Sequence, residues 1–133
     1  MKRALQSAAG FTLIEMLVVI SIITILAGMS MAQYKHGTRL AQEAVLKEDL
    51  FRMREGIDQY YADKGQYPPD LTALVSEGYL REMPRDPFTR SSDSWQTIPA
   101  EPDTANPSAQ PGVYDVKSGS EETSADGTKY SEW

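Results

Sequence analysis

The sequence predicts an α+β fold, in which one long N-terminal α-helix packs on a small domain. Two observations predict the helix: an apolar run over residues 11–32 whose only charge is Glu15, and an amphipathic pattern over residues 33–64. Residues 65–133 hold short apolar segments separated by Gly, Pro and Asp turns. We therefore expect a helix that spans a membrane in its first half, a short second helix and a two- or three-stranded antiparallel sheet.

The apolar run follows a basic leader, residues 1–10, that ends in a small residue. An ordinary signal peptide is removed together with its apolar core, whereas a cut after Gly10 would remove the leader alone. The apolar segment would then begin with the free amine of Phe11. Glu15 is the natural counter-ion for that cation, in the same copy or in a neighbouring one. A carboxylate at the bilayer centre costs about 2.5–3.5 kcal/mol on insertion scales, so Glu15 requires such an explanation.

Residues 11–32 are long enough to span about 30 Å of hydrocarbon at about 1.5 Å per residue. Four residues can donate their hydroxyls to helix carbonyls or to a neighbouring helix: Thr12, Ser21, Thr24 and Ser30. Gly28 is the weakest helix former of the span, and if the helix melts we expect melting at Gly28 or Gly37. Lys2 and Arg3 place the N-terminus in the cytoplasm and the rest of the chain across the inner membrane.

Residues 33–64 continue the helix with one apolar stripe, which consists of Leu46, Leu50, Met53, Ile57 and Tyr60. The stripe is interpreted as the face that packs on the domain's own sheet, and a coiled-coil seam is the alternative. The helix is expected to end near Asp63, because Lys64-Gly65 suits a left-handed C-cap.

The domain begins with a two-turn helix and continues with short strands. Asp70 is the expected N-cap, followed by a buried side made of Leu71, Leu74 and Val75, and the helix is expected to end at Gly78. Strands are expected at three places: 94–98, 113–117 and 129–133, the last with Trp133 in the core. A proline-rich loop over residues 99–111 separates the first two strands, and Asp126-Gly127 indicates a turn.

Two stretches carry a family resemblance. The leader, Gly10-Phe11-Thr-Leu-Ile-Glu15 and the apolar run resemble the class III signal of type IV pilins and pseudopilins, in which a prepilin peptidase cuts after the glycine and methylates the new N-terminal phenylalanine. The run from Tyr60 to Phe88, with its Gly-x-Tyr-Pro and Pro-x-Asp-Pro elements, resembles the major pseudopilin of type II secretion systems. The resemblance implies a type IV pilin-like fold, N-methylated Phe11, and assembly through Phe11 and Glu15. An uncleaved anchor with a stray glutamate is the alternative.

The resemblance implies a structural subunit that polymerises with copies of itself into a periplasmic pseudopilus and helps to export folded proteins. Its partners would be membrane lipid before assembly, the prepilin peptidase, minor pseudopilins, the inner-membrane platform and, indirectly, a cytoplasmic assembly ATPase. The alternatives are the major pilin of a surface type IV pilus, a minor tip pseudopilin, and a single-span enzyme or binding module. The absence of cysteine argues against the surface pilin, because many such pilins carry a C-terminal disulfide loop, and Glu15 argues against a tip subunit.

Composition excludes several classes of chemistry. The net charge is −6, and the last 43 residues hold eight acids and two lysines, so a nucleic-acid partner is not expected. With no cysteine, thiolate zinc sites and cysteine catalysis are excluded. The single histidine, His36, is expected to be an exposed residue just outside the membrane, without a metal or catalytic partner. No phosphate-binding loop is present, and no enzyme is predicted.

The acidic C-terminal turn is a candidate calcium site. Calcium takes roughly six to eight oxygen ligands, including backbone carbonyls. Major pseudopilins bind one calcium here in a Ser-x-Gly-x-Asp pattern, from which Ser118-Gly-Ser-Glu121 departs by one missing residue and by Glu in place of Asp. Transferred by resemblance, Glu121 and Asp126 would be side-chain ligands, with carbonyls near Ser118. The alternative is a solvated acidic turn held by strand pairing and by Trp133.

Overall fold

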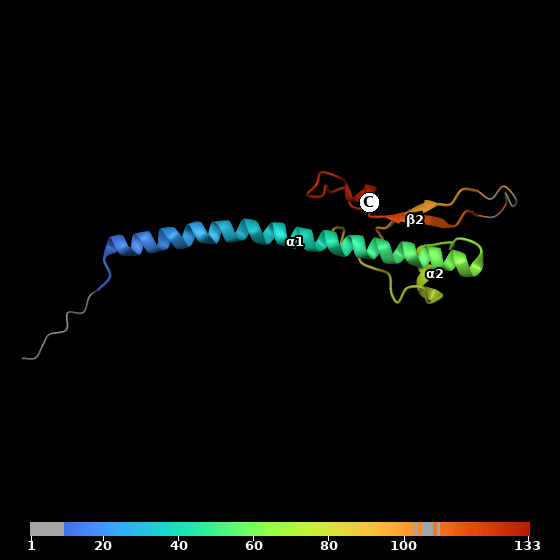
Figure 1. The fold of residues 1–133 in the computed structure, drawn as a ribbon, viewed down its shortest axis with the longest axis horizontal. Coiled ribbons are helices and arrows are strands. Elements are labelled where there is room, and N and C mark those ends of the chain that lie inside the picture. Colours follow the sequence, from blue (N-terminus) through green and yellow to red (C-terminus); the bar gives the residue numbers. More distant parts are fainter. Residues whose placement is uncertain (1–9, 103, 105–107, 109) are drawn as a thin grey trace, which may run out of the picture. The chain divides into compact units, whose positions relative to one another are not determined.

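A computed structural model describes residues 10–102, 104, 108 and 110–133. Its elements follow the order α1 (Leu13–Lys64), α2 (Leu71–Ser76), β1 (Gln96–Pro99), β2 (Val113–Lys117) and a final 3₁₀ helix, η1 (Tyr130–Glu132) (Figure 1). The α+β class is confirmed: a long helix, a short helix and an antiparallel pair of strands. The predicted leader lies outside the described residues except for Gly10, and so do residues 103, 105–107 and 109 of the predicted proline-rich loop.

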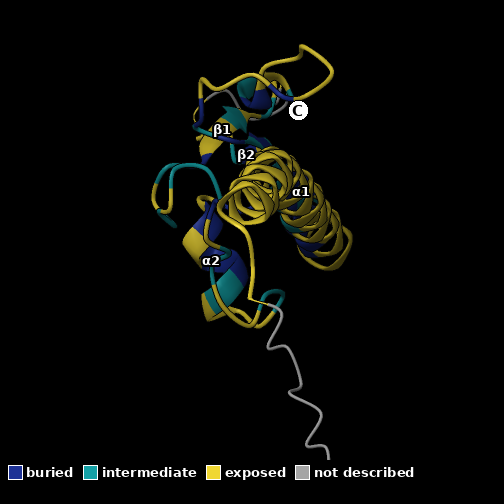
Figure 2. Cartoon of the chain, turned by 90° about the vertical axis from the view of Figure 1, so that its left-hand side faces the viewer, coloured by how far each residue is buried: buried dark blue, intermediate teal, exposed yellow. Residues whose placement is uncertain are grey.

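The chain divides into two compact units, Met1–Thr38 and Arg39–Trp133, and α1 contributes to both. In the first unit, the described helical residues are exposed to solvent on every side (Figure 2). Its most apolar 18-residue window has a mean hydropathy of 2.3, so among the described helices α1 alone has the length and composition to cross a membrane.

Three of the four predicted hydroxyl contacts within the apolar span are confirmed. Ser21, Thr24 and Ser30 each donate to the carbonyl oxygen four residues earlier, at 2.6, 2.7 and 2.9 Å. These side chains therefore need no external partner for their hydrogen atoms. The Thr12 hydroxyl does not donate to a helix carbonyl, because Thr12 lies before the first turn of α1.

In the second unit α1 buries the predicted stripe. All five stripe residues are buried: Leu46, Leu50, Met53, Ile57 and Tyr60. They join one core cluster with Leu71 and Leu74 of α2, Trp95, and Val113 and Val116 of β2. The stripe thus packs on its own domain, as predicted.

The end of α1 and the start of α2 both have the predicted caps. Gly65 has a φ of 71°, and its N–H donates to the Tyr61 carbonyl at 2.8 Å, as suits a left-handed C-cap. At the start of α2, the Asp70 carboxylate accepts from the Ala73 N–H at 2.8 Å and from the Thr72 hydroxyl at 2.6 Å. These two hydrogen bonds hold the pKa of Asp70 below its ordinary value. The α2 helix ends at Ser76, and Gly78, at a φ of 86°, turns the chain as predicted.

The sheet consists of β1 and β2 in antiparallel register, with Thr97 opposite Val116. The strand expected over residues 129–133 is wrong. Lys129 makes a single bridge to Thr123, and the chain then turns into η1. Tyr130 and Trp133 explain this difference, because their rings pack together with centroids 5.0 Å apart. Residues three apart share a face in a 3₁₀ helix but lie on opposite faces of a strand.

Two glycines allow close backbone approaches between distant segments. A Cβ placed at Gly119 would lie 2.0 Å from the carbonyl oxygen of Ser94, and one at Gly112 would lie 2.6 Å from Tyr67. The segment after β2 therefore reaches the segment before β1 only because residue 119 lacks a side chain.

We predict that Gly119→Ala destabilises the chain by about 1–3 kcal/mol or more, because its Cβ meets backbone that cannot move aside. Gly56→Ala is the matched control. Its Cβ would lie 3.6 Å from Leu80 in an ordinary contact, and alanine favours the helix by up to about 1 kcal/mol. Thermal unfolding of the purified chain in detergent micelles measures both. Equal stability of the two variants would contradict the close approach at Gly119.

Candidate functional site

The first turn of α1 places the predicted processing and assembly residues together. The Glu15 N–H donates to Thr12 Oγ1 at 3.2 Å, and the Thr12 N–H donates to Glu15 Oε2 at 3.5 Å. This reciprocal pair is a capping box, in which Thr12 is the N-cap and Glu15 the third helical residue. The sequence analysis missed it, although the Thr-x-x-Glu spacing is its signature. The Thr12 hydroxyl therefore accepts a hydrogen bond here and does not donate to a helix carbonyl.

Gly10 and Phe11 precede the helix and are exposed, Phe11 to 77%. The bond between them thus lies outside the hydrogen-bonded helix, where a peptidase can reach it. Glu15 is exposed as well, and the positive end of the helix dipole favours a carboxylate in this first turn. Cleavage after Gly10 and pairing of the Phe11 amine with Glu15 stay predictions.

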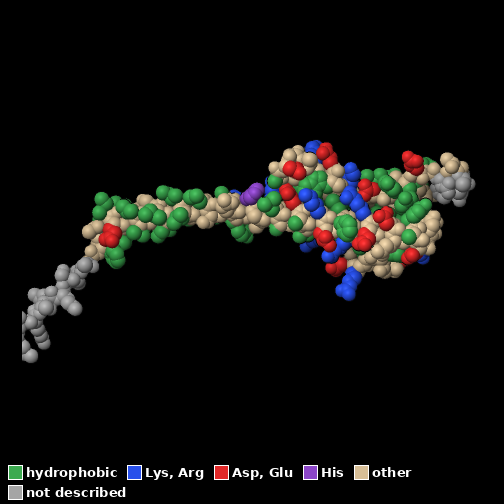
Figure 3. Space-filling model, viewed as in Figure 1, with side chains coloured by type: hydrophobic (Ala, Val, Ile, Leu, Met, Phe, Trp, Pro, Cys, Tyr) green, Lys and Arg blue, Asp and Glu red, His purple; other side chains and the backbone are tan. Residues whose placement is uncertain are grey.

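The apolar surface behind this turn has no partner within the described chain. Every large apolar side chain from Leu13 to Met31 is exposed, and apolar side chains follow the helix in the space-filling view (Figure 3). Fully burying one such side chain is worth about 1.5–3 kcal/mol. A surface of this kind therefore favours lipid or other apolar helices over water. His36 lies farther along α1 and is exposed, as predicted.

The three predicted calcium ligands each contact a different partner. The buried Ser118 hydroxyl donates to Asp86 Oδ2 at 2.5 Å, and Lys129 Nζ lies 3.3 Å from Glu121 Oε2. Asp126 Oδ1 accepts from the Thr128 N–H at 3.0 Å, from the Thr128 hydroxyl and from the Ser124 hydroxyl.

The turn around Asp126 is held by hydrogen bonds of its own. The hydrogen bonds from Ser124 and Thr128 lower the pKa of Asp126 to about 2, so its carboxylate is already stabilised as an anion by the turn itself. Among the described residues, no cluster of three or more His, Asp or Glu side chains is placed to hold a metal ion. The calcium site stays a prediction, and no step of the function below depends on it.

Asp86 is a buried carboxylate that the sequence analysis did not single out. It is fully buried, and its Oδ1 accepts from the N–H groups of Phe88 and Thr89 at 2.8 and 3.2 Å. Its Oδ2 accepts from Ser118, so one side chain fixes the turn after residue 86 and joins it to the segment after β2. The Pro-x-Asp-Pro pattern could have indicated this role, because aspartate before proline commonly caps a turn.

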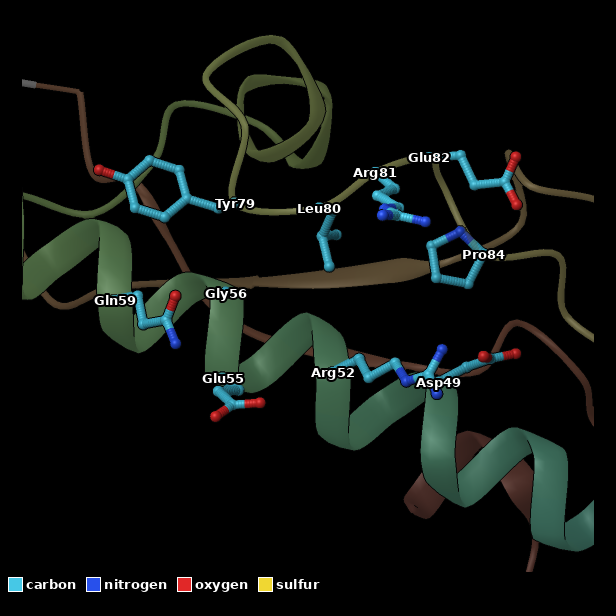
Figure 4. Close-up of a pocket in the computed structure, with 10 residues that line it drawn as sticks. All are labelled: Asp49, Arg52, Glu55, Gly56, Gln59, Tyr79, Leu80, Arg81, Glu82 and Pro84. Atoms are coloured by element: carbon cyan, nitrogen blue, oxygen red, sulfur yellow. The ribbon is translucent and has the colours of Figure 1, made fainter.

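A groove of about 360 Å³ lies between α1 and residues 79–84 (Figure 4). Its charged lining residues come from both sides: Asp49, Arg52 and Glu55 from α1, and Arg81 and Glu82 from the facing segment. Burial raises the pKa of Asp49, and the nearby Arg52 opposes that rise. The residues that line the described groove include no Ser, Cys or His, so it contains no Ser–His or Cys–His pair.

The comparisons with known proteins agree with the N-terminal geometry. A family model described as the prokaryotic N-terminal methylation motif matches residues 5–31, which include Gly10, Phe11 and Glu15. The class defined by this motif and by the helix-plus-sheet fold is that of the type IV pilin-like proteins. No solved structure matches the chain significantly.

Relatives among characterised proteins give the family within this class. The chain is 35% identical over 104 residues to the type II secretion system core protein G of Pseudomonas aeruginosa, covering 66% of this chain and 72% of that protein. It is 30% identical over 99 residues to core protein G of Klebsiella michiganensis, covering 62% and 70%. Fimbrial protein EcpC of Eikenella corrodens is 35% identical over 83 residues, covering 59% and 54%.

The chain belongs to the family of the type II secretion system core protein G, the major pseudopilins. This membership confirms the resemblance seen in the sequence. The family is structural, and one apolar N-terminal helix fits a protein anchored in the inner membrane.

We predict that Asp86→Ala destabilises the chain by about 3 kcal/mol or more, because three hydrogen-bond donors lose their acceptor and one of them, the Ser118 hydroxyl, is fully buried. Asp86→Asn should cost less, since the amide oxygen can still accept from the two backbone N–H groups. Asp93→Ala, at an exposed aspartate nearby, is the control and should be neutral. Denaturant unfolding orders the three variants, and a neutral Asp86→Ala would refute the role of Asp86.

Proposed function

We propose that this chain is the repeating subunit of a periplasmic pseudopilus in a type II secretion system and helps to drive the export of folded proteins. The observation that carries the proposal is the exposed apolar part of α1, whose first turn holds Glu15 in a capping box within the matched methylation motif. A membrane anchor alone accounts for the apolar surface. It does not account for Glu15.

The apolar surface has two suitable environments in turn. Before assembly the helix lies in lipid, and afterwards it is reburied among the same helices of other copies. Lipid and protein are equally apolar, so this transfer gains little from the hydrophobic effect and depends on helix packing and on polar pairs. Glu15 supplies one half of such a polar pair. The pairing is favoured because a charge buried without its partner costs several kcal/mol. Pairing Glu15 with the Phe11 amine of an adjacent copy fixes the register between subunits.

Processing creates that partner. A prepilin peptidase cuts after Gly10 and methylates Phe11, which leaves a cationic amine at the start of the apolar segment. The leader, residues 1–10, carries Lys2 and Arg3, and its charge supports a cytoplasmic N-terminus with the second unit in the periplasm.

The subunit acts by polymerising and is not an enzyme under this proposal. The groove between α1 and residues 79–84 has no Ser, Cys or His among its lining residues, and the sequence carries no phosphate-binding loop. Energy for extraction from the membrane therefore comes from partners: an inner-membrane platform and a cytoplasmic assembly ATPase, with minor pseudopilins at the tip.

The relative named a fimbrial protein supports one further candidate, the major pilin of a surface type IV pilus. A single comparison separates the two. A deletion strain and its parent are scored for exoproteins in the medium and for sheared surface filaments. Loss of exoproteins with unchanged surface filaments supports the pseudopilin. Loss of filaments with intact secretion would make the chain a pilin and overturn the proposal.

We predict that Glu15→Val and Glu15→Ala leave membrane insertion intact and reduce filament assembly by at least about tenfold, the factor that corresponds to a loss of only 1.4 kcal/mol. The reason is that the Phe11 amine would enter the filament core without a counter-ion. Membrane fractionation measures insertion, and the yield of sheared or overproduced filaments measures assembly. Wild-type filament yield from Glu15→Val would contradict the pairing.

Two matched variants separate the charge of Glu15 from its capping role. Glu15→Gln keeps an acceptor for the Thr12 N–H but removes the charge, and it should fail to assemble. Thr12→Val removes the capping hydroxyl but keeps the charge, and it should assemble close to the wild-type level. The reverse pattern would mean that Glu15 acts by capping its own helix.

A further inference from the structure

One face of α1 carries four charged residues that all contact the C-terminal lobe, defined here as residues 118–133, or the end of β2. They are Arg39, Glu43, Lys47 and Arg54. The first three recur every four residues, the spacing that aligns side chains along one face of a helix. None of these contacts was predicted from the sequence.

Glu43 is the centre of this arrangement. It is only 8% exposed, and its Oε1 accepts from the Tyr130 hydroxyl at 2.8 Å and from the Ala125 N–H at 3.0 Å. Arg39 completes the set, because its Nε donates to the same Tyr130 hydroxyl at 3.2 Å and lies 4.0 Å from Glu43. A charge with this little exposure is retained only where several donors replace its water.

Arg39 also contacts the turn of the lobe. Its Nη2 donates to the carbonyl of Thr123 and lies 3.8 Å from the carboxylate of Glu122. One pair of helical residues, spaced by four, thus contacts both ends of the turn, residues 122–125 on one side and Tyr130 on the other. The ring of Tyr130 is fully buried and stacks on Phe88 with centroids 3.9 Å apart.

Arg54 and Lys47 of α1 contact the last residue, Trp133. Arg54 donates to the Trp133 carbonyl at 2.9 Å and to Asp115 at 2.7 Å, and Lys47 Nζ lies 4.5 Å from the centre of the Trp133 ring. The Trp133 indole N–H donates to Thr128 at 2.8 Å. The last residue is therefore held from the helix and from the turn at once.

The same lobe contains the residues predicted to bind calcium, and each already has an internal partner. Ser118 donates to Asp86, Glu121 pairs with Lys129, and Asp126 accepts three hydrogen bonds within its own turn. A cation at Glu121 and Asp126 would compete with Lys129, Ser124 and Thr128 for the same carboxylates.

We propose that a clamp formed by Arg39, Glu43 and Tyr130 fastens the C-terminal lobe to α1, and that this clamp does the work of a bound cation, so the lobe closes without calcium. Arg39 and Glu43 each contact residues 122–125 as well as Tyr130, and the Tyr130 hydroxyl joins the two side chains. The inference concerns the folded subunit alone and stands whether or not the subunit forms a pseudopilus.

The test uses the purified full chain in detergent micelles, with millimolar calcium or with EGTA. Two readouts are recorded: the thermal midpoint, and the rate of tryptic cleavage after Lys129, which lies in the lobe. For the wild-type chain, both should be the same with calcium and with EGTA. Glu43→Gln should lower the midpoint by about 10 °C, as expected for a domain of about this size when a buried carboxylate that accepts two hydrogen bonds loses its charge. It should also speed the cleavage after Lys129 at least about tenfold.

Two variants keep the test specific. Glu48→Gln removes an exposed helical glutamate that pairs only with Arg52 at 2.8 Å, and it should change neither readout. Tyr130→Phe keeps the buried ring and deletes the shared hydroxyl, so it tests the clamp if Glu43→Gln fails to fold. A calcium-dependent rise of the midpoint or slower cleavage in the wild-type chain would overturn the proposal. Wild-type behaviour of both Glu43→Gln and Tyr130→Phe would overturn it as well.

Discussion

The constraint on which the rest of this molecule depends is that one helix carries two incompatible surfaces. From Leu13 to Met31 the large apolar side chains of α1 are all exposed, whereas beyond Arg39 one apolar stripe is buried in the core of the domain. A helix that is apolar all round belongs in lipid or among other helices, and a helix with one apolar stripe belongs on a domain. The chain satisfies the second requirement by itself. It can satisfy the first only with lipid or other molecules.

The second unit meets its own requirement with apolar packing at one side of α1 and charged contacts beside it. The stripe from Leu46 to Tyr60 packs in the core, while Arg39, Glu43 and Arg54 contact the end of the chain. The core explains why the domain folds on the helix. The charged contacts explain how a C-terminal lobe without regular strands is held in one position on the helix. Hydrogen bonds and ion pairs are directional, whereas apolar packing is not.

The sequence predicted those features that depend on local patterns. The helical stripe, the Asp70 cap, the Gly65 and Gly78 turns and the paired strands each follow from residues near one another in the chain, and each is confirmed. The contacts of Asp86 with Ser118 and of Glu43 with Tyr130 could not be predicted, because these partners lie 32 and 87 residues away and no spacing rule joins them. The mistaken strand over residues 129–133 has the same origin: the packing of Tyr130 against Phe88 and Trp133 decides its shape.

The central claim is that the exposed apolar half of α1 is buried against other copies of itself after assembly. Because the chain has no cysteine, Leu26→Cys introduces a single reactive thiol into that surface. Crosslinking with a short membrane-permeant bismaleimide then compares cells that contain the assembly machinery with cells that lack it. The account predicts covalent dimers that require the machinery and disappear when Glu15→Val is added. Monomers alone in assembly-competent cells, or dimers that form equally without the machinery, would contradict it.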